Sequence, residues 1–191
     1  MRLFLAINLE PAVRRSVIDA TTPLRDAAPS LSWVDESRLH LTLKFLGAQT
    51  DEVLEPLKSS MSDVALQHRV FRMRVSDIGA FPNFRRARVV WMGVDRDPRL
   101  EFLHHDVELA CERLGFELEG RPFRPHLTLA RVKERTDLEE LRLLSRAGKK
   151  VDFEAESVVR SIDLMKSNLD RATAESSGRY ERLHVATLRE S

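Results

Sequence analysis

The sequence predicts an α+β fold with a mostly antiparallel sheet, and three observations support this. Predicted strands and helices follow one another without a regular βαβ alternation. No linker or low-complexity tract divides the 191 residues. The tetrapeptide HLTL occurs at residues 40–43 and again at 126–129, which indicates two similar lobes. We therefore expect residues 1–191 to form a single domain built from two lobes.

In the first half, the spacing of apolar residues separates strands from helices. Pro11 suits the first turn of a helix, and Pro23 is expected to kink or end it. Strict alternation in residues 39–46 predicts that Leu43 and Phe45 share one buried face. The predicted strands are residues 3–9, 39–46, 71–75 and 88–94, and the predicted helices are residues 11–23 and 53–66.

In the second half, capping signals define two helices. Asp97 followed by Pro98 predicts the start of a helix that ends at Gly115. Thr136 and Glu139 form a capping box for a helix that runs to about Ala147. The predicted strands are residues 126–132, 151–155, 158–165 and a final strand around 183–185, and residues 169–179 are expected to form a loop.

Composition excludes several classes of protein. The single cysteine, Cys111, rules out an internal disulfide framework and an all-cysteine metal site. No stretch approaches the roughly 18 apolar residues that a membrane-spanning helix needs, and we expect a cytoplasmic protein. The net charge of +1 does not by itself require a nucleic-acid partner.

The repeated His-x-Thr pattern places polar side chains on one face of each strand. Side chains alternate in a strand, so His40 and Thr42 point away from Leu41, and His126 and Thr128 repeat this arrangement. Histidine has an unperturbed pKa of about 6.5, so two imidazoles at one pocket suit acid–base chemistry near neutral pH. Two threonine hydroxyls can stabilise the negative charge that grows on phosphate oxygens.

The repeat is also compatible with a purely structural origin. One His-x-Thr pair on a strand is typical of a solvent-exposed surface, and a structural duplication would also repeat HLTL. Histidine is rare in the chain, with six residues, so a chance repeat is improbable. The chemistry requires an acid and a base on opposite sides of phosphorus, but alternation along a strand does not say which histidine is which.

HLTLKFLG followed by HLTLARV resembles the 2H phosphoesterase superfamily, in particular its RNA 2′,3′-cyclic phosphodiesterases, also called 2′-5′ RNA ligase-like proteins. The resemblance extends to RLFLAINLE, WVDESRLHLTLKFLG, FPNFRRARVVWMGV and GRYERLHVATL, and so covers most of the chain. Ala87 departs from the family, which commonly has proline there. This difference concerns the stiffness of a loop more than the chemistry.

The resemblance implies a bilobal fold with pseudo-twofold symmetry, outer helices and an active-site cleft between the lobes. It implies opening of an RNA-terminal 2′,3′-cyclic phosphate to a 2′-phosphomonoester, without a metal or another cofactor. Carried onto this chain, His126 is the proton acceptor for water and His40 the proton donor to the leaving 3′-oxygen, while Thr42 and Thr128 hold the phosphate. The implied partners are RNA ends or nucleotides with a 2′,3′-cyclic phosphate and no membrane, and we expect a monomer.

Several further residues are candidates for substrate binding. Strict alternation would bury Arg131 among the leucines at a high cost, so we expect the strand to end or twist near Ala130 and free this side chain. Lys44 is expected to share the face of His40 and to steer a phosphate, although a solvated lysine explains it equally well. Alternation places Phe45 in the core, away from substrate.

Phe84, Arg85 and Arg86 lie on a predicted loop and are candidates for stacking on a base and gripping backbone phosphates. An exposed loop without a ligand role is the alternative.

Two alternative functions use the same residues. The site can run in reverse and join RNA halves through a 2′-5′ bond, or it can be a catalytically spent RNA-binding module. The intact histidines and threonines of both segments argue against the spent module. A dimetal hydrolase needs clustered carboxylates and histidines, and none lie near either segment in the sequence.

Overall fold

The structure is a computed structural model that describes residues 1–133, 136–168 and 180–190. Its strands are β1 (Arg2–Asn8), β2 (Ser32–Trp33), β3 (His40–Ala48), β4 (Phe71–Phe81), β5 (Val89–Val94), β6 (His126–Arg131), β7 (Glu154–Val159), β8 (Ser161–Ser167) and β9 (Tyr180–Thr187). Its α-helices are α1 (Pro11–Ala20), α2 (Thr22–Ala27), α3 (Leu54–Ala65), α4 (Pro98–Arg113) and α5 (Leu138–Gly148), with short 3-10 helices η1 (Glu36–Arg38), η2 (Asp51–Val53) and η3 (Phe84–Arg86).

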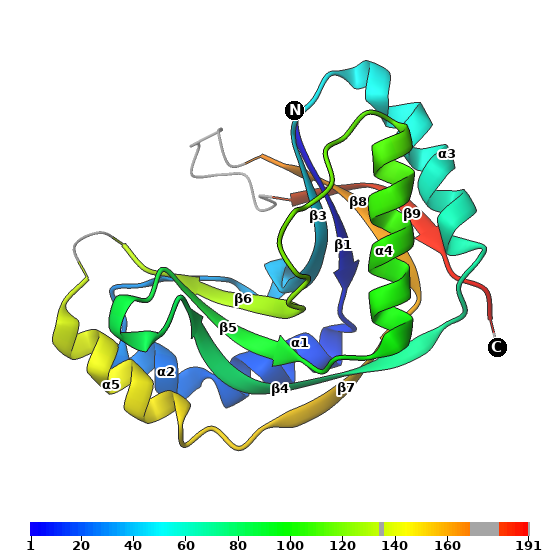
Figure 1. Cartoon of the computed structure of the whole chain (residues 1–191). Helices are drawn as coiled ribbons and strands as arrows, with labels where there is room; N and C mark the ends of the chain where they lie inside the picture. The colour runs from blue at the N-terminus through cyan, green and yellow to red at the C-terminus, as the bar shows by residue number, and fades with distance from the viewer. Residues whose placement is uncertain (134–135, 169–179, 191) are drawn as a thin grey trace.

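The strands form one antiparallel sheet that bends into two lobes, as Figure 1 shows. The order is β7-β4-β5-β6-β3-β1-β8-β9, and β2 pairs with β6. The first lobe contains β3, β1, β8 and β9, and the second contains β6, β5, β4 and β7. Reading outward from β3 and from β6 gives four strands on each side, which confirms the predicted two-lobed α+β fold.

The lobes join through the two strands that carry the His-x-Thr segments. The register between β3 and β6 comprises the pair Leu41–Leu127, and both leucines are buried. These side chains belong to the main hydrophobic core, which extends through both lobes. The repeated segments therefore lie side by side at the centre of the sheet, although 86 residues separate them in sequence.

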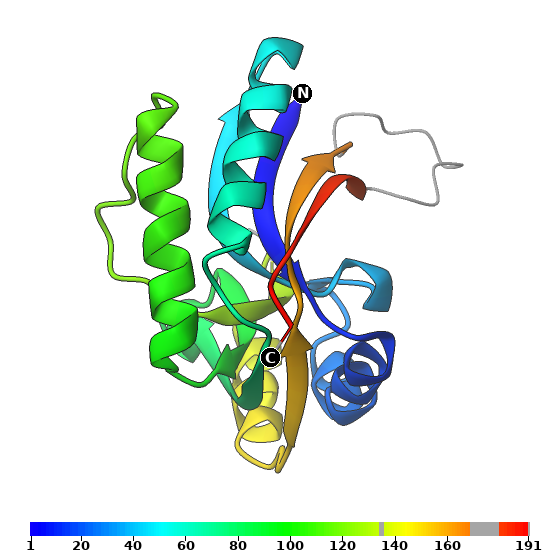
Figure 2. The same cartoon turned by 90° about the vertical axis from the view of Figure 1, so that its right-hand side faces the viewer.

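Helices cover the faces of the sheet that point away from the other lobe (Figures 1 and 2). Helices α3 and α4 lie side by side on the first lobe, where α3 also contacts β8 and β9. Helices α2 and α5 contact each other on the second lobe, and α1 contacts β7. The five α-helices of the described residues therefore leave the inner faces of both lobes uncovered. Within the described ranges, no helix is long and apolar enough to cross a membrane.

Most predicted elements are present, with a few differences. The helix that was expected to kink or end at Pro23 is interrupted at Thr21, and α2 follows it directly. Asp97 caps α4 as predicted, since its carboxylate accepts a hydrogen bond from the N–H of Arg99 at 2.8 Å. The cap of α5 is Asp137 rather than Thr136, because the Asp137 carboxylate accepts from the N–H of Glu139 at 3.1 Å.

Two strand boundaries were also wrong. β7 begins at Glu154, so residues 151–153 lie outside it, and β4 continues to Phe81 rather than ending near residue 75. The loop predicted at residues 169–179 lies outside the described residues.

Candidate active site

The two His-x-Thr segments face each other across the joint between the lobes. In an antiparallel pair, the Leu41–Leu127 register places His40 opposite Thr128 and Thr42 opposite His126. All four of these side chains point to the face opposite the buried leucines. Each histidine is therefore the cross-strand neighbour of the other segment's threonine, as expected for a pseudo-twofold site.

The same kind of backbone hydrogen bond holds both imidazoles. Nδ1 of His40 donates to the carbonyl of Arg38 at 2.8 Å, and Nδ1 of His126 donates to the carbonyl of Arg124 at 2.7 Å. A carbonyl only accepts, so each Nδ1 carries a proton and Nε2 is the reactive nitrogen of the neutral ring. Both histidines are thus oriented for proton transfer through Nε2.

The two Nε2 atoms differ in their partners. Nε2 of His40 lies 3.1 Å from the hydroxyl oxygen of Thr42. Nε2 of His126 has no partner among the residues described by the structure. The lone pair of His126 is therefore open to an incoming water, whereas that of His40 is engaged by a hydroxyl.

Both histidines lie against aromatic rings and are partly buried. The ring of His40 is 5.0 Å from Phe4 and 5.4 Å from Tyr180, and that of His126 is 5.1 Å from Phe81, measured between centroids. These apolar surroundings disfavour the charged form of each ring.

The pKa values of both histidines are lowered. Burial lowers the pKa of His40 most, and the charges of His126, Arg131 and Arg38 lower it further against the opposing effect of the Arg38 carbonyl. Burial also lowers the pKa of His126, with a further decrease from Arg131 against the opposing Arg124 carbonyl. Both rings are consequently neutral near pH 7 in the free protein.

A one-residue bulge follows each His-x-Thr pair and reverses the alternation of side chains. In the β1–β3 register, Ala6 pairs with Thr42 and Leu5 with Lys44, so Leu43 is the extra residue. In the β5–β6 register, Trp91 pairs with Thr128 and Val90 with Ala130, so Leu129 is the extra residue. A bulge of this kind moves every later side chain to the other face.

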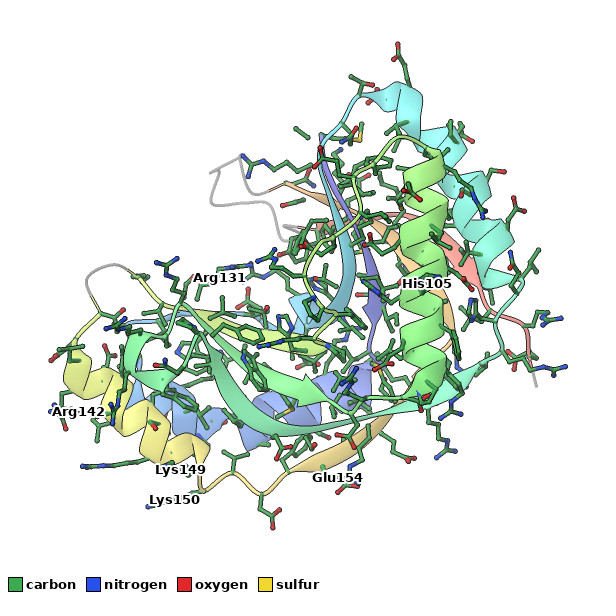
Figure 3. The ribbon with its side chains drawn as sticks, viewed as in Figure 1. His105, Arg131, Arg142, Lys149, Lys150 and Glu154 are labelled. Atoms are coloured by element: carbon green, nitrogen blue, oxygen red, sulfur yellow. The ribbon has the colours of Figure 1, made fainter. Side chains whose placement is uncertain are left out.

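The bulge exposes Arg131 on the inner face, as predicted, although its cause is a bulge rather than an early strand end. Figure 3 shows Arg131 on the side of the second lobe that faces the first lobe, whereas Arg142 of α5 and the two lysines that follow this helix, Lys149 and Lys150, lie on the far side. In the first lobe, the equivalent residue is Phe45. Its side chain is 69% exposed, so the prediction that it belongs to the core was wrong.

The prediction that Lys44 shares the face of His40 was also wrong. The bulge at Leu43 turns Lys44 toward α4, where its ammonium donates to the Glu108 carboxylate at 2.7 Å and to the carbonyl of Glu117 at 2.8 Å. Both side chains of this ion pair are less than one tenth exposed. Lys44 therefore connects β3 to α4, and it does not reach the inner face.

The remaining predicted binding residues lie away from the histidines. Phe84 packs under α5, with its ring 3.4 Å from the position that a side chain at Gly148 would take. Arg85 and Arg86 are exposed on η3, where their N–H groups are capped by Asn83. None of the three lines the cavity beside His40.

A cavity of about 500 Å³ runs along the inner face of β3. Its lining includes His40, Thr42, Thr128 and Arg131, so the structure brings four of the predicted site residues together. His126 does not line it, but a positive charge on His126 is close enough to lower the pKa of His40. Phe4, Arg38, Phe45 and Tyr180 also line the cavity.

The sequence held a signal for two of the lining residues that were missed. The repeat is longer than HLTL, since RLHLTL begins at Arg38 and RPHLTL begins at Arg124. Aligning the two segments also makes Phe45 equivalent to Arg131. Phe45 could therefore have been placed on the inner face by its equivalence to an arginine that the core would not accept.

A second, more open groove of about 580 Å³ lies at the start of β4 and α4. Its arginines are paired with carboxylates, as in Arg72–Glu156 and Arg99–Asp97, and no histidine lines it. No group of three or more potential metal ligands occurs in the described part of the chain. This second groove therefore lacks the histidines that mark the site between the two His-x-Thr segments.

Known proteins share this architecture. The structure of TT0787 from Thermus thermophilus superposes with a TM-score of 0.78 at 29% identity, covering 100% of both chains. Escherichia coli LigT in complex with 3′-AMP gives a TM-score of 0.72 at 27% identity, covering 98% of this chain and 97% of that one. These matches confirm the predicted fold class.

Sequence relatives carry the name RNA 2′,3′-cyclic phosphodiesterase. The Methanocaldococcus jannaschii protein is 31% identical over 88% of this chain and 92% of its own length. The Aeropyrum pernix protein is 37% identical over 72% of this chain and 77% of its own length. The Geobacillus stearothermophilus protein is 34% identical over 67% of this chain, and the match spans 41% of that longer protein.

A family model agrees with these relatives. The model described as the 2′-5′ RNA ligase superfamily matches residues 10–171, which include both His-x-Thr segments. This match extends over most of the chain, and it accounts for the predicted resemblance. The chain belongs to the 2′-5′ RNA ligase superfamily.

Proposed function

We propose that this protein hydrolyses the 2′,3′-cyclic phosphate at RNA ends to a 2′-phosphomonoester. The observation that carries the proposal is the Leu41–Leu127 register, which sets His40 and His126 diagonally across one site, each opposite a threonine. The names of the relatives support the same reaction class. The four residues His40, Thr42, His126 and Thr128 form the proposed catalytic set.

His126 acts as the base in this mechanism. Its free Nε2 removes a proton from water, and the water oxygen forms a bond to phosphorus as the bond between phosphorus and the 3′-oxygen breaks. His40 gives its Nε2 proton to the departing 3′-oxygen, so the phosphate remains on the 2′-oxygen. The hydroxyls of Thr42 and Thr128 donate to the non-bridging oxygens, where negative charge grows.

Substrate binding supplies the protonated form of the acid. The pKa of His40 is lowered in the free protein, mainly by burial. A bound phosphate anion beside Nε2 favours the imidazolium and raises this pKa. The proton that His40 later donates is therefore taken up as the substrate binds. The assignment of acid and base follows the family resemblance, and the open Nε2 of His126 supports it.

The exposed ring of Phe45 is the proposed contact for the nucleoside. It lines the same cavity as His40, and a large exposed aromatic side chain there can stack on a base. LigT has been solved with 3′-AMP, which shows a nucleotide bound to that relative. Arg131 contacts the phosphate side of the substrate in this arrangement. We propose that the protein acts on RNA ends in the cytoplasm as a monomer, because one chain supplies an acid, a base and both phosphate-binding hydroxyls.

The decisive experiment uses an oligoribonucleotide with a 2′,3′-cyclic phosphate end, incubated in EDTA. Phosphorus NMR is expected to show conversion of the cyclic phosphate to a 2′-phosphomonoester at the same rate as without EDTA. Binding without turnover would identify a spent RNA-binding module. A 3′-phosphate product, or loss of activity on chelation, would contradict the proposed mechanism.

The family description favours ligation as a second candidate. The same acid–base pair can join a 2′,3′-cyclic phosphate end to a 5′-hydroxyl end when this hydroxyl replaces water: His126 takes the proton of the 5′-hydroxyl as its oxygen bonds to phosphorus, and His40 again protonates the departing 3′-oxygen. Water is present in large excess over RNA ends and the five-membered ring is strained, so hydrolysis is favoured. Mixing the two kinds of RNA end and separating the products by gel electrophoresis would reveal a 2′-5′ joined strand.

A further inference from the structure

Arg38 lines the cavity beside His40, and its charge has no assigned role in the proposed mechanism beyond a contribution, smaller than that of burial, to the lowered pKa of His40. It stands two residues before His40, as Arg124 stands two residues before His126. The carbonyls of both arginines accept the Nδ1–H of their histidine. The backbone role is thus shared by the two lobes, and the side chains can be compared directly.

The two guanidinium groups are placed differently. The Arg38 side chain is only 16% exposed and lines the cavity, whereas Arg124 is exposed and lies outside it. Nη2 of Arg38 is 3.0 Å from the carboxylate of Asp35, and its Nε is buried without a hydrogen-bond partner. A guanidinium has five N–H donors, so the contact with Asp35 engages only part of the Arg38 fork, whose side chain lines the cavity.

The order of side chains along the strands divides the cavity into three parts. His40 and Thr128 form one cross-strand pair between β3 and β6, and Thr42 and His126 form another, on the other side of the Leu41–Leu127 pair. Arg38 and Arg131 extend the site beyond the first pair, and both charges act on His40. Phe45 lies beyond the second pair. The cavity therefore has Arg38 and Arg131 at one end and the two histidine–threonine pairs in the middle, while Phe45 lies toward the other end, where Arg2 also contributes to the lining.

The reacting phosphate occupies the middle, between the two histidines. Arg38, at the end of η1, lies two residues before His40, and its side chain lines the same cavity as that histidine. A nucleotide with a 2′,3′-cyclic phosphate carries one further anionic group attached to the same sugar, the phosphate on its 5′-oxygen. In an RNA strand, this group is the phosphodiester that leads to the preceding nucleotide.

We propose that Arg38, together with Arg131, forms a second phosphate subsite for the group on the 5′ side of the terminal nucleotide. The subsite rests on the proposed function, and it makes the protein select a nucleotide within a strand over a free nucleoside cyclic phosphate. Bidentate contacts of arginine with phosphate are the chemistry that such a subsite would use.

The test compares two substrates and two charge-matched variants. The substrates are adenosine 2′,3′-cyclic phosphate and the same molecule with a 5′-phosphate. Arg38→Gln is expected to lower kcat/KM for the 5′-phosphorylated substrate roughly tenfold or more through KM, and to change the unphosphorylated substrate less than about twofold. Arg124→Gln removes the same charge outside the cavity and should leave both substrates nearly unchanged.

Arg38→Lys keeps the charge and should restore part of the preference for the 5′-phosphate. Equal losses on both substrates would assign Arg38 to the reacting phosphate and overturn the subsite. Equal effects of Arg38→Gln and Arg124→Gln would overturn it as well. The Arg38 carbonyl is unchanged in these variants, and the Asp35 side chain is 75% exposed, so the fold should be retained.

Binding of non-reacting ligands separates the subsite from the proposed function. By calorimetry, Arg38→Gln should weaken adenosine 3′,5′-bisphosphate about tenfold more than adenosine 3′-monophosphate. This difference is expected even if the unmodified protein turns over neither cyclic substrate. Equal weakening of both ligands would contradict the subsite whatever the catalytic result.

Discussion

The segments at residues 40–45 and 126–131 have the same backbone but different side chains at two positions. Both present histidine and threonine on the inner face, and both contain a bulge one residue after the threonine. After the bulge, the first lobe places Lys44 under the sheet and Phe45 in the cavity, whereas the second places Ala130 and Arg131 there. The proposed catalytic groups are duplicated, while the packing groups and the proposed binding groups are specific to each lobe.

Substitution of the histidines, which both segments share, should have the largest effect on catalysis. Replacing His40 or His126 with alanine should each lower kcat by at least about 100-fold, because proton transfer from or to one side of the phosphorus is lost. Steady-state kinetics on a cyclic-phosphate oligoribonucleotide measures this, with circular dichroism to verify the fold. Full activity in either variant would show that the two segments do not act together.

The free energy of unfolding should depend strongly on the charge of Lys44, whereas its counterpart in the second lobe, Ala130, carries no charge. Lys44→Met leaves the Glu108 carboxylate buried without its partner, which should lower the free energy of unfolding by about 3–5 kcal/mol. Urea denaturation provides the measurement, and the double variant Lys44→Met/Glu108→Leu should recover much of the loss.

Lys58→Met is the matched control, because the Glu55 partner of Lys58 is 83% exposed. This change should cost less than about 1 kcal/mol. If Lys44→Met lowered the free energy of unfolding by no more than Lys58→Met does, the buried ion pair between Lys44 and Glu108 would have no structural role.

Substrate affinity should depend on Phe45 without any large effect on stability. Phe45→Ala removes a stacking surface and should raise KM about 5–100-fold, since stacking of a base on an aromatic ring contributes about 1–3 kcal/mol. Phe45→Trp should keep a KM near that of the unmodified protein. If Phe45→Ala left KM unchanged, the base of the substrate would not stack on Phe45, and the proposed nucleoside contact in the first lobe would be wrong.

The smallest expected effect is on the pH dependence. Activity needs a neutral His126 and a protonated His40, so kcat/KM falls below the pKa of the first and above the pKa of the second. Both pKa values are lowered, so the maximum should lie on the acidic side of pH 6.5.

The charge of Arg131 lowers both pKa values, so Arg131→Gln should move both limbs of the profile to higher pH. Phe45→Ala, at the equivalent position, removes no charge and should leave the profile in place. Rate profiles from pH 4 to 9 would test this difference. Unmoved limbs in Arg131→Gln would show that Arg131 does not act on the histidines.

The two segments also differ in how far their side chains could be predicted from sequence. The His-x-Thr repeat predicted the two-lobed fold and the face on which His40 and Thr42 lie, because alternation holds from His40 to Leu43. Alternation failed from Lys44 onward, because a single sequence gives no sign of the bulge at Leu43. Lys44 and Phe45 were therefore assigned to the wrong faces. Arg131 was assigned correctly because a buried unpaired charge is too costly.

The position of Arg38 needed the folded chain. Its exposure depends on η1, which precedes β3, and on the ion pair with Asp35. Neither is encoded by periodicity. The packing of Phe84 under α5 likewise depends on a contact with residues near Gly148, far away in the sequence.

The pairing of Leu41 with Leu127 makes the gap between acid and base a property of the core. The packing of these two leucines sets the spacing of β3 and β6, and with it the separation of the two imidazoles. Replacing either leucine with valine therefore changes this separation without altering any of the proposed RNA-binding groups. Natural variation at these two apolar positions is thus a way to tune turnover while the reactive groups stay the same.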